Sequence, residues 1–335
     1  MRQRGLKRIA GLLAAVSLLC LVKVNYAQEP ETSSNSNASQ SQPQGEKKKS
    51  RSVRTVTIPI TVRLRKTKMP TEEVPQIVGL GVKEDGEEQR IISVHGLGES
   101  SLTLAVLIQD DVVSSINNEI KGIADFIRRL PRGSRVMVGY IRSGSLEVRQ
   151  KFTTDLERAA DSLRITISSS TAAPFNPYVE IIEAIKRFES QPLGRRAMLV
   201  ISDGVDTRNG LDSSSPGLSI DLQRAINEAQ RRSVAIYSFY APTVTLTAGN
   251  NQTLVNNGQG SLDRLAEETG GHAYFQGTGA PVSFDPFLFN LGASLTRQAT
   301  LTYLSTHPKK GYHRIELLYD TTELEIDYPT GYIYR

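Results

Sequence analysis

This chain of 335 residues lacks residues and motifs on which several large protein classes depend. Its one cysteine, Cys20, lies near the N-terminus, so the rest of the chain forms no disulfide bond and relies on its hydrophobic core. The sequence contains no Gly-x-Ser-x-Gly elbow, no glycine-rich loop ending in Gly-Lys-Ser/Thr and no His-Glu-x-x-His pair. These absences argue against the commonest hydrolases and nucleotide-binding enzymes.

Histidine is also scarce, and the four histidines are His95, His272, His307 and His313. None has metal-ligand spacing to another ligand on a shared face, so we expect structural roles near strand ends. The segment 96–98, Gly-Leu-Gly, is not followed directly by a helix. We therefore interpret it as a linker rather than as a phosphate-binding loop.

Basic residues outnumber acidic ones, 40 to 35, which at first favours a nucleic-acid partner. Five of the basic residues lie in residues 1–27, however, and none of the acidic ones does. The chain after residue 27 is formally neutral. We therefore expect no nucleic-acid partner.

Residues 1–27 have the three parts of a secretory signal peptide. Basic residues precede the apolar run Ile9–Val22, and Asn25-Tyr26-Ala27 forms the cleavage region. The run of about 14 residues is shorter than the roughly 20 that a membrane span needs, so we predict cleavage rather than an uncleaved anchor. Residues 28–52 are polar and are predicted to be a disordered linker. The mature protein is expected in the periplasm or outside the cell, without a stable transmembrane segment.

Residues 53–99 are predicted to be an N-terminal β segment. Apolar and polar residues alternate from 53 to 65, which is the period of a β-strand. Two further strands are expected at Ile77–Val82 and Ile91–Val94. The residues between them, Glu84-Asp85-Gly86, favour a hairpin turn.

Residues 100–296 alternate between buried strands and amphipathic helices. The apolar run Leu102–Ile108 indicates a strand buried on both faces, and apolar residues from Ile116 to Leu130 follow at helical spacing. Further strands are predicted at Arg135–Ile141, Leu146–Phe152, Ala197–Ser202, Val234–Phe239 and His272–Phe275. Further helices are predicted after a Thr154 cap, after an Asn176 cap, and at Ile220–Arg232, Leu262–Thr269 and Pro286–Thr296. This order predicts a doubly wound α/β domain with a mainly parallel sheet.

The pattern of β-strands returns in residues 297–335. Strands are expected at Thr300–Leu304, Tyr312–Tyr319 and Leu324–Tyr328. We expect this C-terminal segment to pack with residues 53–99 as a small β module that flanks the α/β domain.

Ligands of doubly wound domains bind beyond the carboxyl ends of the strands. In this chain that rim consists of Gln109–Ser115, Ser168–Asn176 and Asp203–Asn209. A fourth segment, Ala241–Gly260, is polar and rich in Gly and Asn. At about 20 residues it is predicted to be a recognition loop or a mobile insertion.

Two stretches carry a family resemblance. Leu199–Gly204, with the sequence Leu-Val-Ile-Ser-Asp-Gly, is followed by Asp206, and Leu265–Phe275 contains Glu-Glu-Thr-Gly-Gly-His. Both resemble the later half of a von Willebrand factor A (VWA) domain. The flanking residues, Val82–Ile91 and Gly331-Tyr332, are similar to the secreted VWFA-related proteins of acidobacteria, so that the resemblance covers roughly residues 53–335.

The resemblance implies a metal-ion-dependent adhesion site, in which oxygen ligands hold Mg²⁺ or Mn²⁺ and a partner supplies the last ligand. The family's Asp-x-Ser-x-Ser motif is incomplete here. One register gives Gln109, Asp111 and Val113, and the other gives Asp110, Val112 and Ser114. With the second and third loops added, the implied but degenerate ligand set is Asp110, Asp111, Ser114, Thr171 and Asp203.

We therefore expect an exported, non-enzymatic protein that binds a protein or a cell-envelope ligand through the rim, with Ser115, Gly204 and Asp206 completing the binding surface. A metal-free structural scaffold in an envelope complex is an alternative. A second alternative is an enzyme, or the accessory subunit of one, with the rim aspartates as general acid or base.

Overall fold

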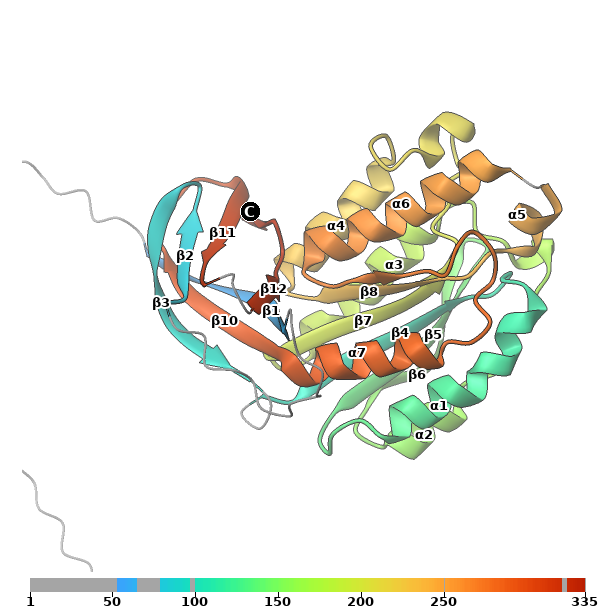
Figure 1. Cartoon of the computed structure of the whole chain (residues 1–335), viewed down its shortest axis with the longest axis horizontal. Helices are drawn as coiled ribbons and strands as arrows, with labels where there is room; N and C mark the ends of the chain where they lie inside the picture. The colour runs from blue at the N-terminus through green and yellow to red at the C-terminus, as the bar shows by residue number, and fades with distance from the viewer. Residues whose placement is uncertain (1–52, 65–78, 97–99, 250, 321–323, 335) are drawn as a thin grey trace, which may run out of the picture. The chain divides into compact units, whose positions relative to one another are not determined.

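The computed structural model describes residues 53–64, 79–96, 100–249, 251–320 and 324–334. The predicted signal peptide and linker lie outside the described residues, as does the start of the strand predicted at Ile77–Val82. All described residues belong to one unit of the chain, Ser50–Arg335. They are organised by a six-stranded sheet with helices on its faces and by a seven-stranded antiparallel sheet (Figure 1).

The six-stranded sheet is doubly wound and mainly parallel, as predicted. Its strands are β4 (Leu102–Gln109), β5 (Arg135–Arg142), β6 (Ser145–Thr153), β7 (Arg195–Ser202), β8 (Ala235–Tyr240) and β9 (Ala273–Tyr274). The strand order is β6-β5-β4-β7-β8-β9, and neighbouring strands are parallel except β5 and β6. Counted within the domain this is 3-2-1-4-5-6, the order of a doubly wound fold. Strands β4, β7 and β8 are buried along their whole length, as their apolar sequences require.

Helices cover both faces of this sheet (Figure 1). They are α1 (Ile120–Arg128), α2 (Leu156–Asp161), α3 (Pro177–Lys186), α4 (Ile220–Arg231), α5 (Val244–Gly249), α6 (Gln252–Thr269) and α7 (Asp285–Arg297), together with the short 3₁₀ helices η1 (Ser114–Glu119), η2 (Ser170–Ala172), η3 (Arg187–Ser190) and η4 (Leu211–Ser214). Apolar residues of α1, α2 and α7 pack in one core and those of α3, α4 and α6 in the other. Among the described residues, no helix combines the length and the apolar character that a membrane crossing requires.

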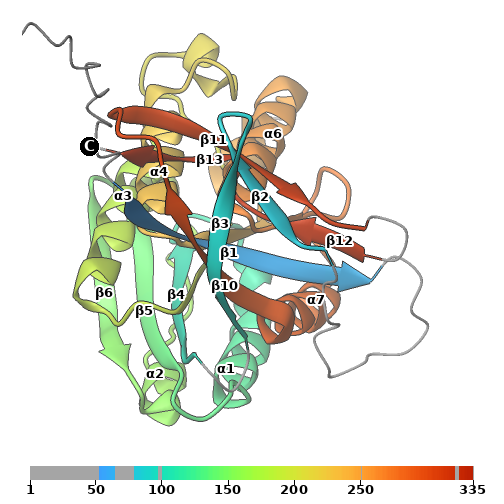
Figure 2. The same cartoon turned by 90° about the vertical axis from the view of Figure 1, so that its left-hand side faces the viewer.

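The seven-stranded sheet is built from both ends of the chain, which confirms the predicted flanking β module. Its strands are β1 (Arg54–Leu64), β2 (Gly81–Glu84), β3 (Glu87–His95), β10 (Gln298–Ser305), β11 (Gly311–Leu318), β12 (Leu324–Asp327) and β13 (Gly331–Tyr334). Their order is β12-β1-β10-β3-β2-β11-β13, so N-terminal and C-terminal strands interleave (Figure 2). The buried residues Ile58, Ile60, Leu301 and Tyr303 belong to its core.

Several local signals have the structural effect that the sequence predicts. Asp85 and Gly86 have positive φ angles of 51° and 88°, as a tight Asp-Gly hairpin turn requires. Asn176 caps α3 by accepting from the Tyr178 N–H. The predicted cap of α2 was wrong by one residue, because the side chain of Asp155, and not that of Thr154, accepts from the Arg158 N–H.

The segment Ala241–Gly260 is not the long loop that its composition predicts. It forms α5 and the first half of α6, which begins ten residues earlier than the helix predicted at Leu262–Thr269. Helix α6 passes very close to the end of β7, because a Cβ atom added to Gly258 would lie 2.1 Å from the Asp203 carbonyl oxygen. Glycine is a weak helix former, but here it permits this close packing, and tertiary contacts override local propensity.

Candidate functional site

The carboxyl ends of β4, β7 and β8 bring together the candidate site. Gln109 ends β4 and is followed by Asp110 and Asp111, while Asp203 follows directly after β7. Thr243 follows β8 and forms a β-bridge with Val112. Because the strands are parallel, their three carboxyl ends lie at one edge of the sheet, and residues distant in sequence become neighbours there.

Asp111 and Asp203 form a buried pair of carboxyl groups. The Gln109 Nε2 donates to Asp111 Oδ1 at 2.9 Å, and its Oε1 accepts from Ser202 Oγ. Asp203 accepts from Thr243 Oγ1 at 2.9 Å and from the Val205 N–H at 3.0 Å. The two side chains are held by partners on all three strand ends, which fixes the pair in position.

Burial governs the protonation of this pair. Burial, together with the negative charge of Asp203, raises the pKa of Asp111 to about 7. Burial also raises the pKa of Asp203, although hydrogen bonds from Val205, Thr243 and Gln109 oppose this effect. Two carboxylates close together in a buried site disfavour double ionisation, so the pair retains a proton near neutral pH.

Asp110 has a different environment. Its two oxygens accept from Arg164 at 2.8 and 3.0 Å, and Oδ1 also accepts from the Ile167 N–H at 3.0 Å. Arg142 Nε lies 3.2 Å from Oδ2. The carboxylate is fully buried among these partners. Of the two registers left open by the sequence, the structure therefore places Asp111, and not Asp110, beside Asp203.

The predicted hydroxyl ligands lie apart from this pair. Ser114 and Ser115 are exposed at the start of η1. Thr171 is exposed in η2, where its Oγ1 is 3.1 Å from Ser169 Oγ. The hydroxyl that does reach Asp203 belongs to Thr243, which the sequence did not single out. Its only signal was its place in the predicted recognition segment Ala241–Gly260, three residues after the buried strand β8.

Mg²⁺ or Mn²⁺ would need oxygen ligands arranged around an open centre. Asp111, Asp203 and Thr243 supply oxygens of the right chemistry. However, the Gln109 amide donates a hydrogen bond to Asp111 and the Val205 N–H donates one to Asp203, so N–H groups already serve these two carboxyl groups. With Asp110 held by Arg164 as well, these side chains are engaged with one another's neighbours rather than arranged around the open centre of an octahedral metal site.

Asp206 and Gly204 have structural roles at the rim. Asp206 accepts from Ser219 Oγ at 2.7 Å and from the Arg208 N–H at 3.1 Å. Asn176 Nδ2 lies 3.4 Å from Asp206 and donates to Asp221 at 2.7 Å. Gly204 has a positive φ of 70°, and a Cβ atom there would meet the Gly258 carbonyl at 2.5 Å. The loops before α3 and α4 are thus tied to the loop after β7.

Five exposed apolar side chains lie on these tied loops and at the start of α4. They are Ile165, Ile167, Phe175, Leu218 and Ile220, with exposed fractions from 43% to 70%. The segment before α3 is anchored because the Ser168 N–H donates to the Asp110 carbonyl at 2.9 Å, and the Thr207 N–H donates to the Phe175 carbonyl at 3.0 Å. The rim therefore displays apolar side chains on fixed backbone, which is typical of binding surfaces.

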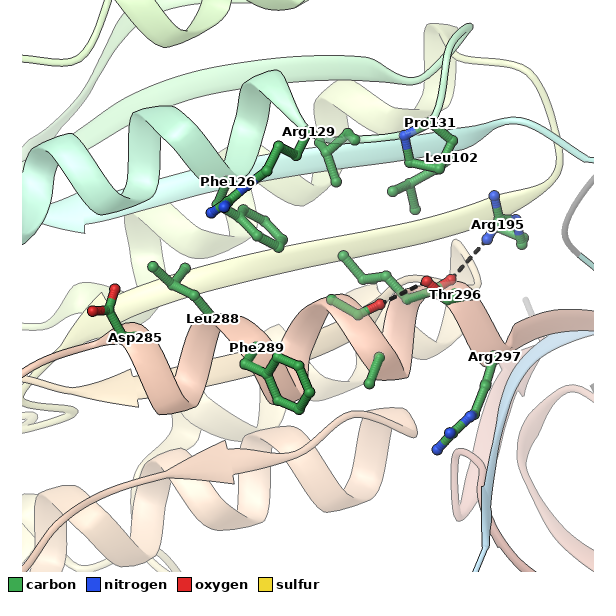
Figure 3. A pocket seen from close by; sticks show the side chains of 14 residues that line it. Leu102, Phe126, Arg129, Pro131, Arg195, Asp285, Leu288, Phe289, Thr296 and Arg297 are labelled. Carbon is green, nitrogen blue, oxygen red and sulfur yellow. Dashed lines mark hydrogen bonds between the residues drawn. The ribbon is translucent and has the colours of Figure 1, made fainter. Parts of the chain in front are cut away.

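A groove of about 950 Å³ lies at the opposite ends of β4 and β7 (Figure 3). It runs between α1 and α7 and is lined by Phe126, Leu288 and Phe289 together with basic side chains, Arg129 and Arg297 among them. The sequence analysis did not predict it.

The strand order and the placement of the Asp203-Gly204 turn at the rim agree with the resemblance seen in the sequence. The strand order itself identifies the α/β domain as a doubly wound fold. A search of family models gave no match, and neither did a search of curated proteins.

Among solved structures, this chain is similar to a von Willebrand factor type A protein from Catenulispora acidiphila, at 10% identity over 76% of this chain and 74% of that one, with a TM-score of 0.41. It is also similar to an aerotolerance-related membrane protein from Bacteroides fragilis, at 11% identity over 58% and 98% of the two chains, with a TM-score of 0.39. A third similar structure is BatB from Bacteroides thetaiotaomicron, at 12% identity over 58% and 97%, with a TM-score of 0.35. At such identities the likeness concerns fold alone.

Proposed function

We propose that this chain is an exported, non-enzymatic binding protein whose VWA-like domain recognises a protein of the cell envelope with its rim. The observation that carries the proposal is the set of exposed apolar side chains on the rim loops. Because buried polar contacts hold these loops in place, little conformational entropy is lost when a partner binds. Rigid apolar anchors with a polar surround are the usual centre of a protein interface.

The burial of the acidic pair supports a non-enzymatic role. Asp111 is 2% exposed and Asp203 is 6% exposed. A general acid or base must come within hydrogen-bonding distance of its substrate. Buried side chains already engaged by Gln109 and Thr243 serve instead to hold the three strand ends together.

We propose further that partner binding is independent of divalent metal. The support is that Arg164 holds Asp110, the Gln109 amide donates to Asp111, and Val205 and Thr243 donate to Asp203. This favours a metal-free rim over an adhesion site that needs Mg²⁺ or Mn²⁺. The metal-free scaffold is then a special case of this proposal, in which the bound partner is a permanent subunit.

The experiment is a pull-down from envelope extract with the mature protein as bait. The variant carries Ile167→Ser and Phe175→Ser, and the control carries Phe289→Ser, which alters an equally exposed side chain at the far end of the domain. We expect the partners captured by the wild type to be lost with the rim variant and retained with the control. Partners retained by the rim variant would contradict the proposed surface, and partners lost on addition of EDTA would contradict metal independence.

A further inference from the structure

The antiparallel sheet contains a cluster of carboxylate and imidazole groups that is separate from the rim. Glu84 ends β2 and Asp85 follows it in the hairpin turn, while His307 follows β10 and His313 lies near the start of β11. Strands β2 and β11 pair, with Ile315 opposite Glu84, and this pairing brings the two segments together (Figure 2). Glu84 is completely buried and His313 is 3% exposed.

The hydrogen bonds of His313 define which ring nitrogen carries a proton. Nε2 lies 2.8 Å from the Lys309 carbonyl oxygen, which only accepts, so Nε2 is the N–H. Nδ1 lies 2.8 Å from Asp85 Oδ2 and 3.3 Å from Glu84 Oε1. Nδ1 therefore faces two carboxylate oxygens, an arrangement that either a proton on Nδ1 or a bound cation satisfies.

Unpartnered buried atoms belong to the same cluster. Glu84 Oε2 is buried without a hydrogen-bond partner, and so is His307 Nδ1. His307 Nδ1 lies 3.6 Å from Glu84 Oε1, and its Nε2 lies 3.6 Å from Glu87 Oε2. A buried polar atom without a partner is costly unless a ligand or an ion completes its environment.

The surroundings of Glu84 keep it in place. Tyr332 OH and Ser305 Oγ donate to its Oε1 at 2.7 and 2.9 Å. Arg54 Nη2 lies 3.6 Å from the same oxygen and brings one positive charge. The cluster nevertheless contains the carboxyl groups of Glu84, Asp85 and Glu87, so one guanidinium does not balance it. A dication would supply the missing positive charge.

We propose that Glu84, Asp85, His307 and His313 form a binding site for a zinc-type dication. Glu84, Asp85 and His313 each offer a ligand atom within 4.8 Å of the others. Around a tetrahedral zinc ion with bonds of about 2.0–2.2 Å, ligand atoms lie roughly 3.3–3.6 Å apart. The contacts of Glu84 Oε1 with the Nδ1 atoms of His313 and His307, at 3.3 and 3.6 Å, match this spacing, whereas Asp85 Oδ2 lies only 2.8 Å from His313 Nδ1 and would move away from it as the ion enters.

The ligand types and the support of His313 also agree with zinc. Imidazole together with carboxylate suits zinc better than magnesium, which prefers oxygen alone. A metal-binding histidine commonly donates its second N–H to a backbone carbonyl, which fixes the tautomer and the ring. The Lys309 carbonyl does this for His313. This proposal does not rest on the proposed function of the rim.

The test is titration of the full mature chain, without a histidine tag, with Co²⁺ as a visible spectroscopic probe for a zinc site. We expect one equivalent to give the absorption of a tetrahedral complex, and Zn²⁺ to displace it. His313→Ala and Glu84→Gln should each weaken binding by roughly tenfold or more. Because both residues are buried, circular dichroism must show that these variants are folded.

His307→Ala provides a variant outside the hydrophobic core of the antiparallel sheet, to which His307 does not belong. We expect it also to weaken Co²⁺ binding roughly tenfold or more. His95→Ala, an exposed histidine of β3, and Asp203→Ala at the rim should bind Co²⁺ as the wild type does. The proposal is overturned if the wild type gives no such absorption, if His307→Ala binds unchanged, or if Asp203→Ala abolishes the signal.

Discussion

The Asp111 carboxyl group couples folding to protons near neutral pH. In the unfolded chain it ionises near its ordinary pKa of 3.8, whereas in the folded protein its pKa is raised to about 7. Between these two pH values the folded protein binds one proton more than the unfolded chain does. The contribution to the free energy of unfolding is therefore largest below pH 4 and is lost as the pH rises through 7.

The substitution Asp111→Asn tests this coupling, because the carboxamide is a neutral replacement for the protonated acid. At pH 7.5 we expect the variant to be more stable than the wild type by about 2 kcal/mol or more, and we expect the difference to shrink towards pH 5. Urea unfolding of both proteins at pH 5, 6 and 7.5 measures this difference in the free energy of unfolding. Taking the difference between the two proteins cancels the effects of other groups with shifted pKa values, such as Asp327. A difference that stays constant with pH would show that Asp111 is ionised in the folded protein.

For individual residues, the sequence predicted which side chains lie at the rim but not which of them are in contact. Asp110 and Asp111 are adjacent and chemically identical, and the sequence does not show that Arg164 lies beside one of them. The histidines of the antiparallel sheet were missed for the same kind of reason. Spacing along the chain cannot reveal that Asp85 and His313 are neighbours, because only the pairing of β2 with β11 brings them together.

Among the elements, α6 is the one whose sequence most misleads. Its first half contains Gly258 and Gly260 among Asn and Gln residues, a composition typical of loops. The helix exists because its small residues allow it to lie directly on the Asp203-Gly204 turn. The buried strands β4 and β7 were predictable, since continuous apolar runs flanked by amphipathic helices leave few other structures.

Gly258→Ala distinguishes packing from helix propensity. Alanine favours a helix over glycine by about 1 kcal/mol, but here the added Cβ meets the Asp203 carbonyl oxygen, so we expect a net loss of about 2 kcal/mol or more. Gly249→Ala in α5 is the control, because a Cβ there has no atom within 4 Å. The control should be neutral or slightly stabilising in thermal unfolding. A Gly258 variant as stable as the wild type would mean that α6 does not pack on the rim turn.

For the whole molecule, the two sheets share buried contacts. Thr61 of β1 and Tyr237 of β8 have hydroxyl oxygens 3.1 Å apart, and Arg195 of β7 donates to the Leu295 carbonyl of α7 at 2.7 Å. Helix α7 continues directly into β10. The sequence predicted both sheets, but these contacts depend on the tertiary structure alone.

We therefore expect the two sheets to unfold as one cooperative unit. In native-state hydrogen exchange, the slowest amides of β1 and β10 should show the same free energy of opening as those of β4 and β7. The Tyr237→Phe variant should lower the free energies of opening of β1, β10, β4 and β7 together, by about 1 kcal/mol. Slow amides in β1 and β10 that open at a clearly lower free energy than those in β7 would show instead that the antiparallel sheet unfolds on its own.

The position of β1 also determines the order in which the molecule can be completed during synthesis. β1 lies between β10 and β12, which are made almost last. The six-stranded sheet has all of its strands once Tyr274 has been made, whereas Arg54–Leu64 has no strand partner until residue 298 and later residues follow. Such long-range pairing is slow. During synthesis, which starts at the N-terminus, the apolar strand β1 therefore remains unpaired until β10 and β12 have been made. The native fold can be completed only after that point.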